Sequence, residues 1–175
     1  MTVEKNDVLS MTITGTERLD PIRVMIEKYE PGKGRITVTC YGQAWTGAWF
    51  AMGGDTVQEF IQGVSNDYLI GYFDRSLEST IDDNINFVQK EIIKLLRSNE
   101  INSTEARDMW DESICSGDVK EKFCNYQLGN CLLNLFGDDP FYAGWPTIPN
   151  PKYQYLSRII DAVRAGLKEL ELEAA

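Results

Sequence analysis

The sequence predicts an α+β fold in which a small N-terminal antiparallel sheet of three to four strands packs with four to five C-terminal helices. Hydrophobic residues alternate between residues 11 and 54, whereas from residue 55 onward they recur at the helical spacing of three and four. A chain of 175 residues suits one domain with a full core, and its 43% hydrophobic content indicates a folded protein. We therefore treat residues 1–175 as a single domain, sheet-rich over 11–54 and helical over 55–175.

Two alternating runs joined by a glycine turn predict an antiparallel hairpin in the first third of the chain. IRVMIEKY (22–29) places alternate aliphatic residues on one face, and RITVTCY (35–41) alternates in the same way. The connection EPGKG (30–34) is typical of a turn, because Pro31 presets φ and because Gly32 and Gly34 accept positive φ. MTITG (11–15) predicts a further short strand.

The stretch YGQAWTGAWFAMGG (41–54) predicts another strand, and small residues between its large rings leave room for the indoles to lie flat against neighbouring strands. Two alternatives stay open. Tyr41, Trp45 and Trp49, with Asp55 or Asp74 supplying polar contacts, can form a ligand-binding face, or the Gly-Gly turn can bind phosphate. Asp55 counts against phosphate, because its carboxylate would repel the anion.

From residue 55 onward the spacing predicts helices. The helix over 79–98 is the clearest, with Asp82 and Asp83 in its first turn. The helix over 101–114 begins at Asn102 or Ser103 and turns Ala106, Trp110 and either Ile114 or Ser113 inward. Helices are also expected over 56–64, 118–136 and 151–172, residues 67–73 are ambiguous, and 138–153 forms a proline-rich loop.

The net charge of −10 is unevenly placed along the chain. Residues 55–139 contain 17 acidic and seven basic side chains, whereas acids and bases balance on either side of this segment. A negative field of this kind repels nucleic acid and favours basic partners. We therefore expect no direct binding of DNA or RNA.

The sequence lacks the side chains on which much enzyme chemistry depends. It contains no histidine, which excludes Ser-His-Asp and Cys-His catalysis, and no glycine-rich nucleotide-binding motif. The four cysteines show no C-x-x-C spacing, so we expect structural thiols, no metal and no cofactor. The absence of a signal-peptide core and of a long apolar run predicts a cytoplasmic protein without a membrane span.

Four stretches carry a resemblance to a known family: LDPIRVMIEKYEPGKGRITVTCYGQAWTGAWFAMG, EARDMWDE, LFGDDPFY and NPKYQYLSRI. Together they resemble a family of phage and prophage accessory proteins, and the run GKGRITVTCYGQAW is the most specific part. The resemblance implies a bacterial host cell and a role outside the virion. It implies no activity and supplies no catalytic residues.

These observations favour a non-enzymatic phage accessory protein that binds a host protein with a basic surface. We expect charge mimicry that inhibits a nucleic-acid-binding defence factor, in the manner of an anti-CRISPR or anti-restriction protein. A solvated acidic surface without a partner, a homo-oligomer, and a small-ligand-binding protein or enzyme using the Tyr41, Trp45 and Trp49 face are the alternatives. The candidate partner-binding residues are Glu105, Asp108, Asp111, Glu112, Asp138, Asp139, Phe141, Tyr142 and Trp145.

Overall fold

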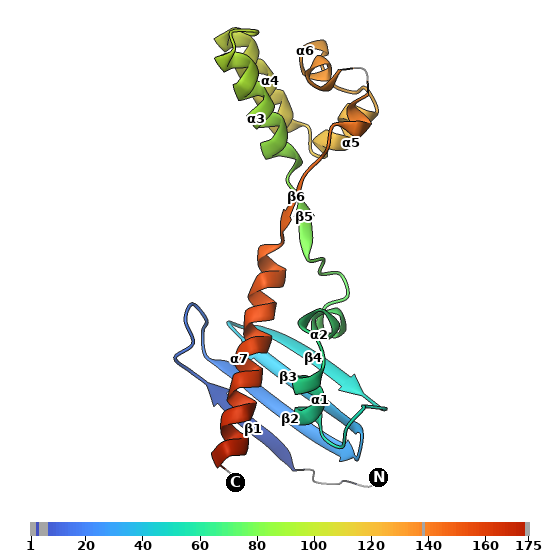
Figure 1. Cartoon of the computed structure of the whole chain (residues 1–175), viewed down its shortest axis with the longest axis vertical. Coiled ribbons are helices and arrows are strands. Elements are labelled where there is room, and N and C mark those ends of the chain that lie inside the picture. Colours follow the sequence, from blue (N-terminus) through green and yellow to red (C-terminus); the bar gives the residue numbers. More distant parts are fainter. Residues whose placement is uncertain (1–2, 4–6, 138, 174–175) are drawn as a thin grey trace. The chain divides into compact units, whose positions relative to one another are not determined.

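The computed structural model describes residue 3, residues 7–137 and residues 139–173 (Figure 1). The chain forms two compact units. The sheet unit comprises Met1–Ser79 and Asn150–Ala175, and the helical unit comprises Thr80–Pro149. The sequence predicts a change from sheet to helix after residue 54, whereas the first helices and the C-terminal helix belong to the sheet unit.

The sheet unit contains a four-stranded antiparallel sheet, which confirms the predicted α+β class. Its strands are β1 (Val8–Ile13), β2 (Ile22–Glu30), β3 (Lys33–Cys40) and β4 (Gln43–Trp49), and they lie in the order β1-β2-β3-β4 (Figure 1). Inward-facing residues lie opposite one another in neighbouring strands. Val38 of β3, for example, pairs with Val24 of β2 and with Trp45 of β4. Alternation in the sequence therefore becomes one apolar face of the sheet.

The turn between β2 and β3 lies where it was predicted, but only one of the two predicted glycines adopts positive φ there. Gly32 adopts φ +74°, whereas Gly34 lies inside β3 and is not among the glycines with positive φ. A Cβ atom on Gly34 would lie 2.4 Å from Val57 Cγ2 and 2.6 Å from Glu27 O. The predicted role of Gly34 in the turn is therefore wrong, because close packing against α1 is what requires a glycine there.

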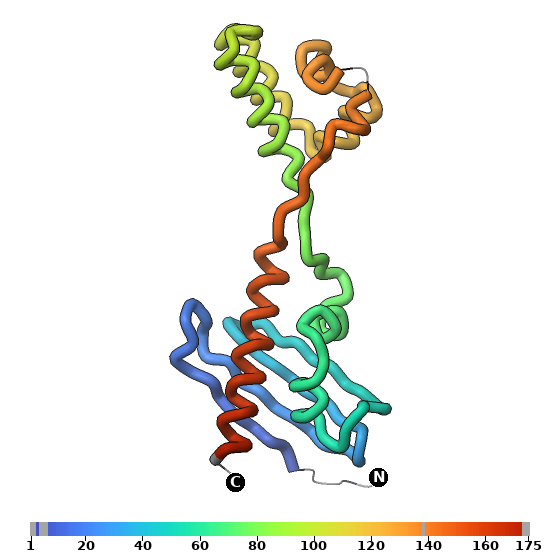
Figure 2. The backbone as a smooth tube through the Cα atoms, viewed as in Figure 1, coloured from blue at the N-terminus to red at the C-terminus, as the bar shows by residue number. Residues whose placement is uncertain are grey.

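Three helices cover the apolar face of this sheet: α1 (Val57–Gly63), α2 (Asn66–Phe73) and α7 (Pro151–Glu173). The chain path in Figure 2 shows α7, from the C-terminal end, lying against strands from the N-terminal third, and its packing on β1 and β2 agrees. The ambiguous segment 67–73 is helical, and Ser65 caps it by accepting a hydrogen bond from the Tyr68 N–H at 3.2 Å.

The aromatic stretch 41–54 contributes Trp49 to this core, whereas Tyr41 and Phe50 are exposed. Trp49 is 4% exposed and packs against Phe60 and Tyr72, with ring centroids 5.1 and 5.2 Å apart. A Cβ atom on Gly47 would lie 2.7 Å from Trp49 Cη2. The expectation that small residues make room for the indoles is therefore confirmed at Gly47.

The helical unit begins and ends with a two-stranded ribbon, in which β5 (Thr80–Asp82) pairs antiparallel with β6 (Thr147–Pro149). The prediction of a helix over 79–98 is wrong in its first turn, because α3 begins only at Asn84 and ends at Arg97. Pairing with β6 gives the backbone of Asp82 a partner, and the Asp83 N–H donates to Pro146 O at 3.1 Å. Local helical spacing could not reveal this long-range pairing.

The predicted helix over 118–136 is also wrong as one continuous element. The chain forms α5 (Val119–Cys124), α6 (Asn130–Leu133) and the 3₁₀ turn η1 (Asn134–Phe136) instead. Tyr126 adopts φ +55°, which ends the first helical segment. The remaining elements are α4 (Ser103–Cys115) and a second 3₁₀ turn, η2 (Pro140–Tyr142), inside the predicted loop.

The helical unit has a core of its own. Phe123 is fully buried and lies at the centre of an aromatic cluster with Phe136 and Trp145, with ring centroids 4.9 and 5.6 Å from its own. The aliphatic part of this core comes from α3 to α6 and comprises Val88, Ile92, Ala106, Met109, Val119, Leu128 and Leu132. Each unit therefore buries its own hydrophobic cluster.

Candidate functional site

An N-terminal capping box positions the acidic helix α4. Asn102 Oδ1 accepts hydrogen bonds from the N–H groups of Thr104 and Glu105, at 2.9 and 3.0 Å. The Glu105 carboxylate accepts a reciprocal bond from the Asn102 N–H at 2.9 Å. The cap fixes where the helix begins, and hence which residues face outward.

The inward face of α4 consists of Ala106, Met109 and Ser113, which are all buried. Ser113, rather than Ile114, takes the last inward position, because Ile114 is 52% exposed. The Ser113 hydroxyl donates to Trp110 O at 2.7 Å, which satisfies this polar group inside the unit. Trp110 itself is only half-buried.

The outward face of α4 carries Glu105, Asp108 and Asp111, which we call the acidic row. All three are exposed, and none of the ion pairs in the described part of the chain involves them. Because they are three residues apart, they follow one another along one side of the helix. The structure therefore brings together three of the predicted partner-binding carboxylates.

Glu112 does not belong to this free surface. It is half-buried, and its Oε1 atom accepts a hydrogen bond from the backbone N–H of Gly129 at 2.7 Å. A Cβ atom on Gly129 would lie 3.0 Å from Glu112 Oε2, so the two residues are closely packed. Its carboxylate serves the packing of α4 against the turn before α6.

The remaining predicted residues of this unit divide between surface and core. Asp139 caps η2 by accepting a bond from the Phe141 N–H at 3.2 Å, and Phe141 and Tyr142 are 65% and 80% exposed. Trp145 lies in the aromatic cluster, and its Nε1 donates to Pro140 O at 2.8 Å. Asp138 lies outside the described residues.

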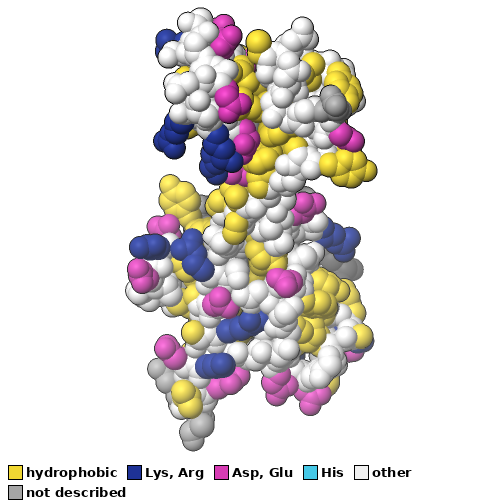
Figure 3. Space-filling model, turned by 45° about the horizontal axis from the view of Figure 1, so that its top comes forward, with side chains coloured by type: hydrophobic (Ala, Val, Ile, Leu, Met, Phe, Trp, Pro, Cys, Tyr) yellow, Lys and Arg dark blue, Asp and Glu magenta, His cyan; other side chains and the backbone are white. Residues whose placement is uncertain are grey.

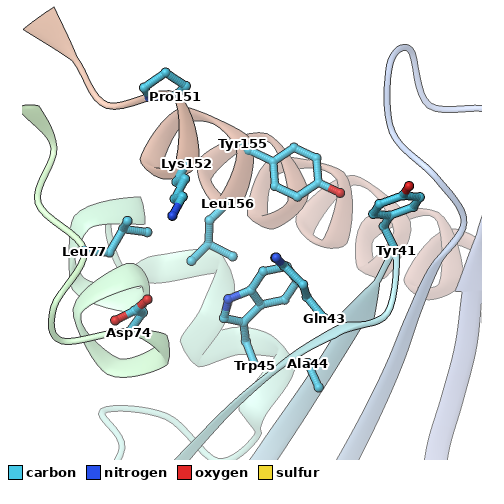
Figure 4. Close-up of a pocket in the computed structure, with 10 residues that line it drawn as sticks. All are labelled: Tyr41, Gln43, Ala44, Trp45, Asp74, Leu77, Pro151, Lys152, Tyr155 and Leu156. Carbon is cyan, nitrogen blue, oxygen red and sulfur yellow. The ribbon is translucent and has the colours of Figure 1, made fainter. Parts of the chain in front are cut away.

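The sheet unit contains a pocket of about 570 Å³ between the start of β4, the end of α2 and the start of α7 (Figure 4). Tyr41 and Trp45 line it, together with Gln43 and Ala44 from the same strand, whereas the buried Trp49 and the exposed Asp55 do not. Asp74, Leu77, Pro151, Lys152, Tyr155 and Leu156 complete the lining.

Tyr155 joins the wall of this pocket to the core beneath it. Its hydroxyl lies 3.3 Å from the thiol of the buried Cys40. The hydrogen bond with Cys40 and burial raise the pKa of Tyr155 to about 12. Cys40 thus behaves as a small core residue, as predicted. The expectation of buried thiols is wrong for Cys115 and Cys131, which are exposed, and Cys124 is half-buried. Of the two acidic residues predicted for this site, Asp74 lines the pocket and Asp55 does not. The sequence did not reveal Lys152 and Tyr155 as pocket residues, because only the fold places α7 beside Tyr41 and Trp45.

Charge is distributed over both units. The helical unit holds twelve acidic and six basic residues, and the sheet unit holds fifteen and eleven. On the face shown in Figure 3, lysine and arginine side chains lie among the acidic ones. The acidic row is therefore a local feature of α4 within a mixed surface.

The profile of a phage family, Phage_phiTE_072, matches residues 1–169 of the chain. The searches of curated proteins and of solved structures found no match to the chain. In the described residues, no helix combines the length and apolar character needed to span a bilayer. Nor do the described Cys, Asp and Glu side chains gather in threes as metal ligands would.

Proposed function

The chain belongs to this phage family, and from that premise we propose that it is a non-enzymatic protein that binds a host protein with a basic surface in the bacterial cytoplasm. The observation that supports the proposal is the acidic row of Glu105, Asp108 and Asp111, whose carboxylates are exposed and form none of the ion pairs found in the described residues. Exposed carboxylates on one helix face can attract a basic partner over several ångströms and orient its approach.

The spacing of the acidic row suits a partner that ordinarily binds nucleic acid. An α-helix rises about 1.5 Å per residue, so these carboxylates follow one another at about 4.5 Å along the axis. Phosphates in one DNA strand follow one another at about 3.4 Å along the axis of the double helix. A basic groove that accepts closely spaced phosphates can accept this row, and the proposed partner is therefore a nucleic-acid-binding defence factor of the CRISPR or restriction type.

Phe141 and Tyr142 give the helical unit an exposed aromatic contact besides its charge. The two rings form an edge-to-face pair with centroids 5.4 Å apart, and the preceding residue in the same 3₁₀ turn, Pro140, is buried. Exposed aromatic side chains supply much of the binding free energy in protein interfaces. We assign them to the same interaction, as the contact that would persist when salt screens the charges.

A pull-down from bacterial lysate at low and at high salt tests the proposal. The double variant Asp108→Asn and Asp111→Asn keeps shape and removes two charges that form no ion pair with the described residues. Glu169→Gln with Glu171→Gln, two exposed positions on α7, removes the same charge from the sheet unit and is the control. We expect capture of a nucleic-acid-binding protein to weaken at least about tenfold in the first variant only.

Two results would contradict charge mimicry. One is capture that is unchanged in the Asp108→Asn, Asp111→Asn variant, and the other is capture that high salt does not weaken. Phe141→Ala or Tyr142→Ala should weaken capture at both salt concentrations, because these rings are assigned an apolar contact in the same interaction.

A further inference from the structure

We propose that the pocket of the sheet unit binds a free aromatic α-amino acid, independently of any partner of the helical unit. The pocket volume of about 570 Å³ lies in the range of small-molecule sites and exceeds what one amino acid needs. Its lining combines aromatic rings, one acidic and one basic side chain, and the amide of Gln43. These are the groups that an aromatic zwitterion requires.

Aromatic rings and charges occupy different parts of this pocket. In Figure 4 the rings of Tyr41 and Tyr155 lie at one side and that of Trp45 at the base, whereas Asp74 and Lys152 lie at the opposite side. An aromatic ligand ring can therefore contact tyrosine and tryptophan faces while its polar end reaches the charges. The arrangement favours a ligand that is apolar at one end and charged at the other.

The two charged residues are of opposite sign, which selects a zwitterion. Asp74 Oδ1 accepts bonds from the Ser76 N–H at 3.0 Å and the Ser76 hydroxyl at 2.7 Å, so its carboxylate is held in one orientation. Its Oδ2 atom and the Lys152 ammonium form none of the hydrogen bonds or ion pairs found in the described residues. An α-ammonium group can pair with the first and an α-carboxylate with the second.

The sign of the surrounding charge argues against nucleotides. The sheet unit holds fifteen acidic and eleven basic residues, and one of the acidic ones, Asp74, lines the pocket. A phosphate ester with two negative charges would meet one lysine against this field. A zwitterion has no net charge and avoids the repulsion.

Tyr41 occupies its position at a conformational cost. It adopts φ +48° and Gly42 φ +73° in the two-residue turn that joins Cys40 to Gln43. Two positive φ values define a type I′ hairpin turn, where asparagine is favoured before glycine and a bulky side chain is not. Tyr41 is also 79% exposed, so its ring adds little to the core. A residue with a strained backbone and an exposed ring that lines a pocket is consistent with ligand contact.

Isothermal titration calorimetry with three related compounds tests the assignment. L-phenylalanine carries both charges, L-phenylalaninamide keeps only the ammonium group, and 3-phenylpropanoate keeps only the carboxylate. We expect binding of L-phenylalanine at millimolar concentration or below and about tenfold weaker binding of each analogue, because each has lost one charge-assisted hydrogen bond. No binding of L-phenylalanine, or equal binding of 3-phenylpropanoate, would overturn the proposal.

Variants separate binding from folding. Lys152→Gln should weaken L-phenylalanine about tenfold without weakening L-phenylalaninamide, and Asp74→Asn should weaken L-phenylalanine without weakening 3-phenylpropanoate, because each analogue lacks the group that pairs with the lost charge. Tyr41→Asn should weaken L-phenylalanine while raising Tm, since asparagine suits the turn. Phe50→Asn, at an exposed aromatic position of the sheet unit outside the pocket lining, is the control and should leave the affinity for all three compounds unchanged. Undiminished affinity in Tyr41→Asn, or equal losses for all three compounds in both charge variants, would contradict the assigned contacts.

Discussion

The carboxylate of Glu112 on α4 accepts a hydrogen bond from the backbone N–H of Gly129 at 2.7 Å, seventeen residues further along the chain. This contact joins α4 to a distant segment, whereas the carboxylate of Glu105 bonds only within the cap of its own helix. The carboxylates of Asp108 and Asp111 take part in none of the hydrogen bonds found in the described residues. We therefore expect Glu112 to contribute to the stability of the fold, whereas the acidic row is assigned to partner binding.

We expect Glu112→Ala to lower the free energy of unfolding by about 1–2 kcal/mol, because it leaves the Gly129 N–H without its partner. Glu112→Gln keeps an oxygen acceptor on a side chain of the same length, so it should lower the free energy of unfolding by less than Glu112→Ala does. Asp108→Ala, on the exposed side of α4, should be nearly neutral. Urea unfolding followed by tryptophan fluorescence measures all three. Equal effects of Glu112→Ala and Asp108→Ala would show that the contact contributes no stability.

Gly47→Ala should destabilise the sheet unit by about 1–3 kcal/mol, because its Cβ atom would lie 2.7 Å from Trp49 Cη2 and 3.2 Å from Phe73 Cε1. The matched change is Gly71→Ala in α2, where no atom lies within 4 Å of the added Cβ. That variant should stabilise the protein by about 0.5–1 kcal/mol, the difference between glycine and alanine inside a helix. Thermal unfolding by circular dichroism distinguishes them, and a shift of the same sign in both would refute the packing argument.

Arg164 is expected to contribute more to stability than any exposed arginine of α7. Its Nε donates to Ile61 O at 2.9 Å, and its two terminal nitrogens donate to Asn66 Oδ1 and Val64 O. These bonds tie α7 to the end of α1 and the start of α2. Lysine cannot reproduce such a planar set of donors.

Arg164→Lys should therefore cost about 2 kcal/mol of unfolding free energy. Arg158→Lys, at an exposed position of the same helix, is the control and should cost little. Guanidinium unfolding of the two variants provides the measurement. A neutral Arg164→Lys would mean that one ammonium group suffices at this junction.

Alkaline pH should destabilise the sheet unit through Tyr153. Burial and the hydrogen bond from its hydroxyl to the Asp67 carboxylate raise the pKa of Tyr153 to about 12, from an ordinary value of about 10. Between these values the unfolded chain has released a proton that the folded chain still holds, so stability is lost as pH rises from about 10 to about 12. It is fully present below about pH 10.

Tyr153→Phe removes this titration, and the fall of unfolding free energy across the same pH interval should be shallower in the variant. Comparison with the parent protein cancels the contribution of lysines, which titrate in the same interval. Denaturant unfolding at a series of pH values measures the slope. Identical slopes would show that Tyr153 has the same pKa in the folded and unfolded chain.

Local features of the sequence determined much of the sheet unit and the start of α4. The alternation in 22–29 and 35–41, with Pro31 and Gly32 between them, predicted the central hairpin, because residues a few positions apart determine both strand faces and turn. The same holds for Asn102, whose side chain caps α4 through residues two and three positions away. Tyr41 and Trp45 were identified from their neighbours in one strand, and they do line the pocket.

Only the tertiary structure decided which residues complete these features. The strand at Thr80–Asp82 needs its partner at 147–149, and Glu112 needs Gly129. The pocket needs Asp74 and Lys152, which lie 78 residues apart in the sequence and meet because α2 and α7 pack on the same sheet face. Side-chain type and short spacing encode what a segment prefers by itself, whereas contacts between distant segments depend on which hydrophobic faces are buried together.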